Sequence, residues 1–236
     1  AFNGGTQFIG AGLNVLNGTG SFSGSVTANN FEFAGGTLSG TATATKTAGT
    51  GMTWSAGTIS GGGTLTFDAN GVLNITGAGA KTISNATIAN QGAVNFTSSV
   101  NVSTNSDGTV VNNQVGGLFH IQSDAGFAGD NTNLETITNA GTLRKTVATG
   151  TSTISNIRLN NTGGTIDFQG GSQLAVTEFN HTGVSSVTAG TVNNTGGGSS
   201  SGSLALSSGT QVNITGGTQS FATGTGITGA GRYRVN

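Results

Sequence analysis

The sequence contains no cysteine and no proline, and only 6% of its residues are charged. Without cysteine, neither disulfide bonds nor thiolate-bound metal ions hold the fold together. An ordinary globular domain has about 25% charged residues, so salt bridges are not the main source of cohesion here. We therefore expect stability to come from backbone pairing and from the stacking of uncharged side chains.

The scarcity of charge also restricts the partners. The chain has 7 Lys and Arg residues and 8 Asp and Glu residues, with a formal net charge of −1. Because no basic excess is present to neutralise phosphates, we expect no nucleic-acid binding. No apolar run approaches the roughly 20 residues that cross a bilayer, so we expect no membrane span. The first residues, AFNGGTQF, lack the features of a signal peptide, so we expect any export signal to lie outside this sequence or to have been removed.

The residues that are present favour β-structure. The chain has 44 Gly and 12 Phe residues, and Thr, Ser, Asn, Val, Ile and Leu occur throughout its length. Disordered chains combine low hydrophobicity with high net charge, which this chain does not. β-Branched and aromatic residues favour strands, and Gly, Thr and Asn interrupt every window that could form a helix. These features predict an all-β protein.

A short glycine-led phrase recurs along the chain. It occurs as GGTLSG at 35–40, AGTISG at 56–61, GGTLTF at 62–67, AGTLRK at 140–145 and GGTIDF at 163–168. Each copy combines a glycine turn with a short β-prone run. The recurrence at about 20 residues is the length of one coil of a three-sided solenoid.

A second phrase consists of an apolar residue, Asn, a variable residue and Gly, as in IANQG and ITNAG. Asn tolerates the left-handed backbone region and Gly prefers it, so the phrase predicts a corner between two strands. Four of these Asn residues are 22 to 26 positions apart, and we expect stacked Asn side chains to satisfy one another's amides. The predicted corner residues are Asn90, Gly92, Asn113, Asn139, Gly141, Asn161, Gly163, Asn194 and Gly196.

Together the repeats predict a right-handed parallel β-helix of about 20 residues per coil, with residues 1–236 as a single segment. About eleven coils would form a rod on the order of 50 Å long. A β-sandwich of short strands is the alternative fold. The segment FNGGTQFIGAGLNV at 2–15 is similar to ITGGTQSFATGTGITGAGRYRV at 214–235. This similarity predicts that the chain spans about one super-repeat of roughly 210 residues.

The glycine- and threonine-rich phrases, the FNGGTQ start and NAGTLRKTVATGTSTI at 139–154 resemble tandem repeats of very large bacterial surface proteins of the filamentous-haemagglutinin and autotransporter-passenger type. The resemblance covers nearly the whole chain and is compositional. It implies export, a β-helical shaft and an extracellular or cell-surface location. The implied partners are further copies of the repeat, placed end to end, and cell-surface glycans or proteins.

Catalysis on a parallel β-helix would need carboxylates that converge on one face. The acidic residues closest together in sequence are Asp124, Asp130 and Glu135, in QSDAGFAGDNTNLE. They are weak candidates for a Ca²⁺ site, because the stretch lacks the D-x-D-x-D-G order of dedicated loops, and a solvated loop is the simpler interpretation. We predict no catalytic residue, metal or cofactor.

Four other polar residues call for an interpretation. His120 alternates with Phe119 and Ile121, so we expect it to face solvent or a stacked polar ladder. His181 takes a corner position in FNHTG, and Arg144 with Lys145 is interpreted as a charged, exposed edge.

These features predict a structural, non-catalytic repeat of an extracellular adhesin, fibre or matrix protein. One alternative is a subunit of a filament that assembles head to tail. The other is a carbohydrate-binding or carbohydrate-cleaving β-helix.

Overall fold

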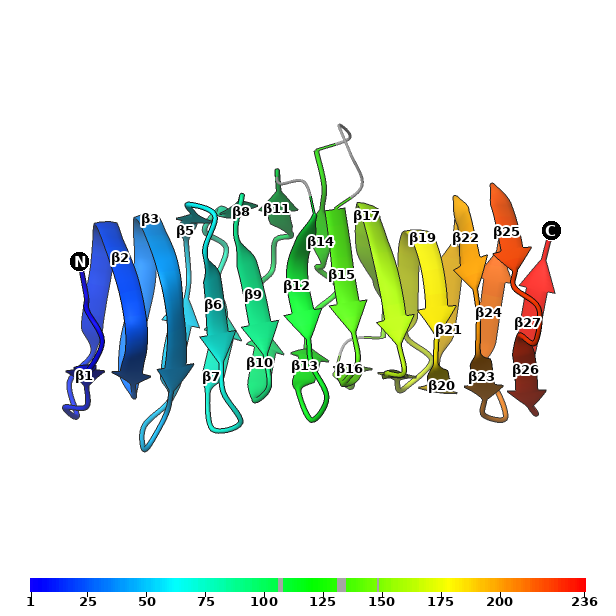
Figure 1. Ribbon diagram of the computed structural model, residues 1–236, viewed down its shortest axis with the longest axis horizontal. Coiled ribbons are helices and arrows are strands. Elements are labelled where there is room, and N and C mark those ends of the chain that lie inside the picture. The colour runs from blue at the N-terminus through cyan, green and yellow to red at the C-terminus, as the bar shows by residue number, and fades with distance from the viewer. Residues whose placement is uncertain (106–107, 131–134, 148) are drawn as a thin grey trace.

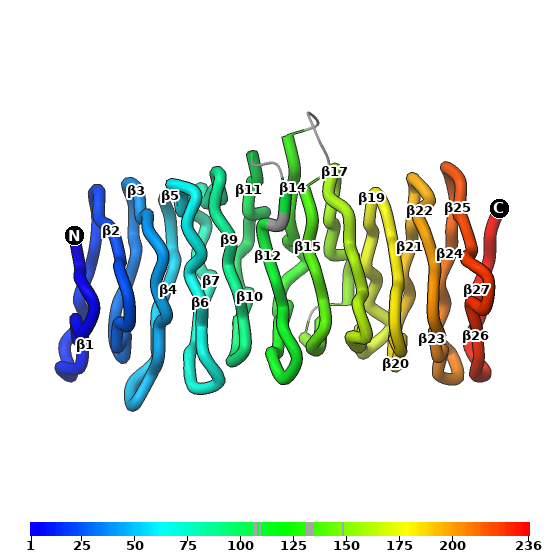
Figure 2. Tube along the Cα trace, viewed as in Figure 1, coloured from blue at the N-terminus to red at the C-terminus, as the bar shows by residue number. Residues whose placement is uncertain are grey.

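The computed structural model describes residues 1–105, 108–130, 135–147 and 149–236. In this part of the chain there is no helix, and 27 strands join in one parallel sheet. The sheet winds into a β-solenoid of about 11 turns with about 21 residues per turn. The two termini lie at opposite ends of the resulting rod (Figures 1 and 2). The predicted all-β parallel solenoid is thereby confirmed, and the β-sandwich alternative is wrong.

Each coil contributes a strand to three faces, and strands of the same face pair in register with the coils on either side. The first face holds β4 (Gly51–Trp54), β7 (Val72–Ile75), β10 (Ala93–Phe96), β13 (Leu118–Ile121), β16 (Thr142–Lys145), β18 (Thr165–Phe168), β20 (Val184–Ala189), β23 (Ser203–Leu206) and β26 (Gly226–Gly229). The second face holds β5 (Gly57–Ser60), β8 (Lys81–Ser84), β11 (Val102–Thr104), β14 (Phe127–Ala128), β21 (Thr191–Asn194), β24 (Gln211–Ile214) and β27 (Arg232–Val235).

The third face holds β1 (Thr6–Phe8), β6 (Thr64–Phe67), β9 (Thr87–Asn90), β12 (Thr109–Asn113), β15 (Glu135–Asn139), β22 (Gly197–Ser200) and β25 (Thr218–Phe221). Four longer strands bend around corners. β2 (Asn14–Ala28) and β3 (Asn30–Thr45) contribute to all three faces, whereas β17 (Thr151–Thr162) and β19 (Gln173–Thr182) cover the second and third.

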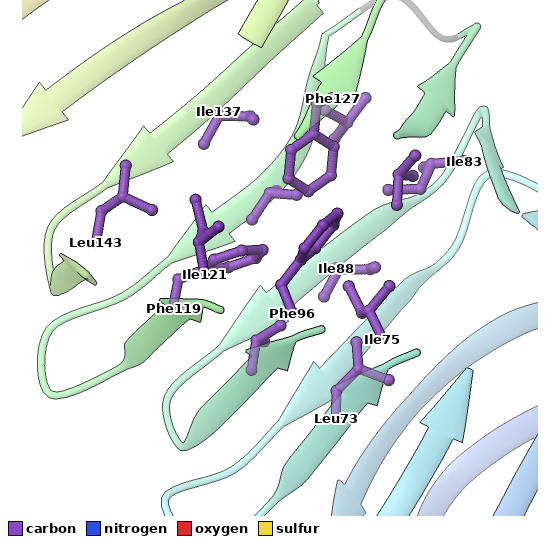
Figure 3. Close-up of a cluster of buried hydrophobic side chains, with 14 of the residues drawn as sticks. Leu73, Ile75, Ile83, Ile88, Phe96, Phe119, Ile121, Phe127, Ile137 and Leu143 are labelled. Carbon is purple, nitrogen blue, oxygen red and sulfur yellow. The ribbon is translucent and has the colours of Figure 1, made fainter. Parts of the chain in front are cut away.

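The core follows from the alternation of apolar and polar residues along each strand. In β7 and β10, Leu73 and Ile75, like Val94 and Phe96, point inward and are fully buried. Because the strands pair in register, equivalent apolar side chains stack from coil to coil. Figure 3 shows this stack continuing through the neighbouring coils. Burying one such side chain stabilises the fold by about 1.5–3 kcal/mol, so the stack supplies cohesion along the whole rod.

Candidate functional site

Four of the predicted corner residues form one buried column on the third face. Asn90, Asn113, Asn139 and Asn161 pair in successive coils and are at most 2% exposed. The Nδ2 of Asn90 donates to Oδ1 of Asn113 at 2.8 Å, and that of Asn113 donates to Oδ1 of Asn139 at 2.7 Å. The Nδ2 of Asn139 continues the series to Oδ1 of Asn161 at 2.7 Å. We call these four residues the amide column.

Each amide in the column also binds the backbone. The Nδ2 atoms of Asn90, Asn113 and Asn139 donate to the carbonyls of Leu118, Thr142 and Thr165, at 3.1, 3.1 and 3.3 Å. The Nδ2 of Asn161 donates to the carbonyl of Gly164 at 2.9 Å. A buried amide is costly unless it is hydrogen-bonded, and here the stacking of coils supplies the partners.

The backbone explanation for these corners needs correction. In the described part of the chain, Asn85 and Asn156 are the non-glycine residues with positive φ, so the column residues do not use the left-handed region. Instead they lie in strands and point inward. Of the predicted glycines, Gly163 has a φ of +87°, whereas Gly141 is required for another reason. A Cβ on Gly141 would meet the carbonyl oxygens of the preceding coil.

The predicted corner at Asn194 and Gly196 lies on the second face, outside the amide column. Asn194 pairs with Val176 and Ile214. Its Nδ2 donates to the carbonyl of Gly197 at 2.6 Å, and its Oδ1 accepts from the backbone nitrogen of Gly196 at 3.2 Å. Asn194 therefore closes its own turn and binds no stacked Asn in the neighbouring coils.

His181 stands next to the amide column, where the register pairs it with Asn161 and then with Ser200. Its side chain is 0% exposed, and both ring nitrogens lack a hydrogen-bond partner in the described structure. Burial holds the pKa of His181 below its ordinary value, because the charged imidazolium would lose its hydration. The other end of the column also has an unpaired group, since Oδ1 of Asn90 has no donor and Phe67 is the next residue in register.

His120 lies in a polar ladder on the outside of the first face. Its Nε2 is 2.6 Å from Oγ1 of Thr146, and its Nδ1 is 3.0 Å from Nε2 of Gln122. Burial lowers the pKa of His120, and the positive charge of Arg144 lowers it further. Arg144 in turn binds Asp167 at 2.8 Å. The predicted position of His120 in a polar ladder agrees with this arrangement.

The prediction that Lys145 is an exposed edge residue is wrong. Its side chain is fully buried, and its Nζ binds Oδ1 of Asp124 at 2.6 Å. The carbonyl of Gly150 and the hydroxyl of Ser152 accept further bonds from Nζ, each at 3.0 Å. The sequence contains a signal for this burial, because Lys145 ends AGTLRK where Phe168 ends GGTIDF, and the two residues pair in register.

Lys81 is a second buried lysine that the sequence interpretation missed. It is 1% exposed, and its Nζ donates to the carbonyl of Gly79 at 2.8 Å. Burial lowers the pKa of Lys81. Lys81 is the first residue of β8 and pairs in register with the buried Val102. Its inward direction follows from the alternation of side chains once the limits of the strand are known.

The three acidic metal candidates differ in their exposure to solvent. Asp124 forms the ion pair with Lys145 and is 55% exposed, Asp130 is exposed, and Glu135 is buried in β15. Among the residues that the structure describes, no three His, Cys, Asp or Glu side chains gather as metal ligands would.

Two further spaces in the described structure differ in size and in the polarity of their lining. The interior cavity between Phe119, Phe127 and Ile137 has a volume of about 10 Å³, which is room for no more than one water molecule. On the outer surface of the third face, a shallow polar depression is lined by Arg158, Asn160, Glu178, Asn180 and nearby Thr and Ser residues. Several of its polar groups already bind one another, because Arg158 forms two hydrogen bonds with Glu178, at 2.6 and 3.0 Å, and Asn180 donates to Asn160 at 2.8 Å.

The two end coils expose apolar side chains. At the amino-terminal end, Phe2, Phe8 and Leu16 cover the core only in part. At the carboxy-terminal end, Phe221 is 47% exposed and packs edge to face on Tyr233, with ring centroids 5.9 Å apart. The coil of Phe221 and Tyr233 therefore carries a partly exposed aromatic pair.

The two similar segments, at opposite ends of the rod, occupy the same face of the coil in only part of their length. The GGTQ sequences at 4–7 and 216–219 lead into β1 and β25, which both lie on the third face. After GGTQ, the carboxy-terminal segment forms the additional strand β26 before its GAG sequence. Consequently GAG at 229–231 leads to the second face, whereas GAG at 10–12 leads to the first.

Comparisons of the chain with family models, with curated proteins and with solved structures give no match. In the described residues, no helix is both long enough and apolar enough to span a bilayer.

Proposed function

We propose that this chain is a non-catalytic structural repeat, a segment of the shaft of an extracellular adhesin, fibre or matrix protein of the filamentous-haemagglutinin or autotransporter-passenger type. The observation that carries the proposal is one column of paired residues that is continuous along the third face. The pairing from Thr6 through the amide column to Phe221 passes through every intervening coil. A column that is continuous along the whole segment suits the shaft of an extended, stiff rod.

The polar groups support the same proposal. Arg144 binds Asp167, Lys145 binds Asp124, and Arg158 binds Glu178. A general acid or base must reach a substrate proton, whereas these charges are bound to one another within the wall of the rod. Their arrangement is that of groups that hold neighbouring coils together.

Surface labelling tests the proposed location. Antibodies raised against the purified chain should label intact cells of the source organism without permeabilisation. Labelling that appears only after the cells are permeabilised would contradict an extracellular role. Electron microscopy of the labelled material should then show rods whose length is a multiple of about 50 Å, the length of eleven coils at the spacing of paired strands.

An enzymatic test addresses the carbohydrate alternative. We expect the purified chain to release no reducing sugar from polysaccharides. Release that is abolished by Glu178→Gln would instead identify the depression beside Arg158 as a catalytic site.

A further inference from the structure

The second face carries a regular set of outward hydroxyl groups in four successive coils. The strands there contain GTGS at 18–21, GTLS at 36–39, GTIS at 57–60 and KTIS at 81–84. In each copy the residue between Thr and Ser is buried, so the Thr and Ser side chains point outward. We call these eight residues the hydroxyl array: Thr19, Ser21, Thr37, Ser39, Thr58, Ser60, Thr82 and Ser84.

The register aligns the hydroxyl array in two straight rows along the rod. The four Thr residues pair with one another in series, and so do the four Ser residues. The pairing of these four strand segments contains no bulge. Paired strands are about 4.8 Å apart, and two residues along a strand span about 6.6 Å. The hydroxyl array is therefore a rectangular net with these two repeats.

The hydroxyl groups of the array are available to water. All eight residues are at least partly exposed. In the described part of the chain, Ser39 is the only one of them whose side chain forms a hydrogen bond, at 3.5 Å to the carbonyl of Gly20. No member carries a charge, and the adjacent Lys81 is buried with its Nζ bound to the carbonyl of Gly79. Because a hydroxyl both donates and accepts hydrogen bonds, each member can bind ordered water.

The threonine row adds a fixed geometry to these hydroxyl groups. Threonine is branched at Cβ, so its side chain is stiff and holds its hydroxyl and its methyl group in place. Immobilising one water molecule costs up to about 2 kcal/mol of entropy. The surface of ice presents water molecules that are already immobilised, so this cost does not arise when a matching array binds them. The oxygen atoms on a prism face of hexagonal ice form a rectangular net with repeats close to those of the hydroxyl array.

We propose that the hydroxyl array binds the surface of ice crystals. This inference goes beyond the proposed shaft function and does not depend on it, because the shaft is held by the inward residues. The binding surface is limited to the coils of the array. Further along the second face, outward amides bind one another instead, since Asn213 donates to Asn193 at 3.0 Å and Asn193 donates to Gln173 at 2.8 Å.

Thermal hysteresis, the gap between the melting and freezing temperatures of a seeded ice crystal, tests the proposal. The unmodified chain should produce a gap that grows with concentration, together with faceted crystals. Thr58→Tyr places a bulky ring in the middle of the threonine row and should abolish the gap. Thr66→Tyr is the matched control that should keep it, because Thr66 points outward from β6 on the third face. Tyrosine favours strands, so both variants should fold, which circular dichroism checks.

Adsorption of the fluorescently labelled chain to a single ice crystal gives a second measurement. The unmodified chain and Thr66→Tyr should coat the prism faces, whereas Thr58→Tyr should leave them bare. The proposal would be overturned by a chain that shows neither hysteresis nor adsorption at any soluble concentration, or by equal activity of the two tyrosine variants. Adsorption to crystalline cellulose but not to ice would also overturn it and would identify a polysaccharide surface as the ligand.

Discussion

The side-chain nitrogen of Asn113 lies 2.7 Å from the side-chain oxygen of Asn139, in the interior of the solenoid and 26 residues further along the chain. This bond joins one coil to the next, so it forms only when the two coils are stacked. A slip between coils would leave these buried amides without partners, so the amide column strengthens the preference for one register that the apolar core already imposes. The apolar core therefore holds the coils together, and the amide column helps to determine the register in which they stack.

Asn113→Ala should lower the free energy of unfolding by about 3 kcal/mol. The change removes one of the two acceptors of Asn90 Nδ2, which keeps its bond to the carbonyl of Leu118, and it leaves Oδ1 of Asn139 without its donor. A buried group that loses its partner costs about 1–3 kcal/mol. Asn95→Ala is the control, because Asn95 donates to Asn74 at 2.9 Å on the outer, partly exposed surface. Urea unfolding and amide hydrogen exchange in β9, β12 and β15 measure both variants. Equal losses of unfolding free energy in the two variants would show that the buried amide column stabilises the fold no more than an exposed Asn pair does.

His181→Asn should extend the amide column by one residue. The register places position 181 directly after Asn161, and an asparagine there can accept from the column where the histidine ring has no partner. We expect the variant to be more stable than the unmodified chain at pH 7 by about 1 kcal/mol, the value of one net hydrogen bond. Thermal unfolding followed by circular dichroism is the measurement, and His181→Ala, which adds no amide, is the control that should be less stable.

The stability of the unmodified chain should fall as the pH falls below about 6.5, the ordinary pKa of histidine. Burial lowers the pKa of His181 in the folded state, so below this pH the unfolded chain binds more protons than the folded chain. Stability therefore rises with pH through this window and is lost as the pH decreases. His120 has a lowered pKa as well and contributes in the same direction. Urea midpoints between pH 4.5 and 7.5 should depend less on pH in His181→Asn, and an unchanged pH dependence would show that His181 does not titrate on unfolding.

The sequence is informative about the fold because one coil is repeated with little variation. Glycine-led phrases at about 20 residues and the spacing of Asn90, Asn113 and Asn139 were sufficient to predict a parallel solenoid. The placement of the charged residues was harder to predict. Lys145 was interpreted, with Arg144, as a charged and exposed edge, whereas it is buried with a partner, Asp124, that comes from the preceding coil. Contacts between coils depend on the register, which the sequence of one strand does not specify.

The same limit applies to the candidate site. His181 was recognised as a corner residue, but its burial follows from its column, in which Asn161 and Ser200 are its neighbours. The strands β26 and β27 could not be assigned to faces before they were placed. The similarity of the two GGTQ segments indicated related ends, yet only the coordinates show that β26 shifts the later residues by one face.

Lys145→Met should leave stability unchanged or raise it, whereas Lys145→Ala should lower it by about 2–4 kcal/mol. Lys145 stacks between Ile121 and Phe168 in an apolar column, and methionine fills a similar volume without a charge that must be desolvated. Alanine leaves a cavity in the same place. The side chain of Asp124 is 55% exposed, so water can solvate its carboxylate when Lys145 is replaced. Loss of the ion pair therefore costs little stability. Urea unfolding compares the three proteins, and a methionine variant as unstable as the alanine variant would show that the ion pair itself stabilises the coil.

Gly141→Ala should destabilise the solenoid even though its backbone conformation is open to any residue. A Cβ at this position would meet the carbonyl oxygens of Gly117 and Gln114, which belong to the preceding coil, and these are backbone atoms that cannot move without disturbing the register. Overpacking of this kind typically costs about 1–3 kcal/mol. Gly12→Ala is the matched control, because a Cβ there has open space and an ordinary φ. Hydrogen exchange should show faster opening of β13 and β16 in Gly141→Ala alone. If both variants were equally stable, the close approach of successive coils at this corner would not be what requires glycine.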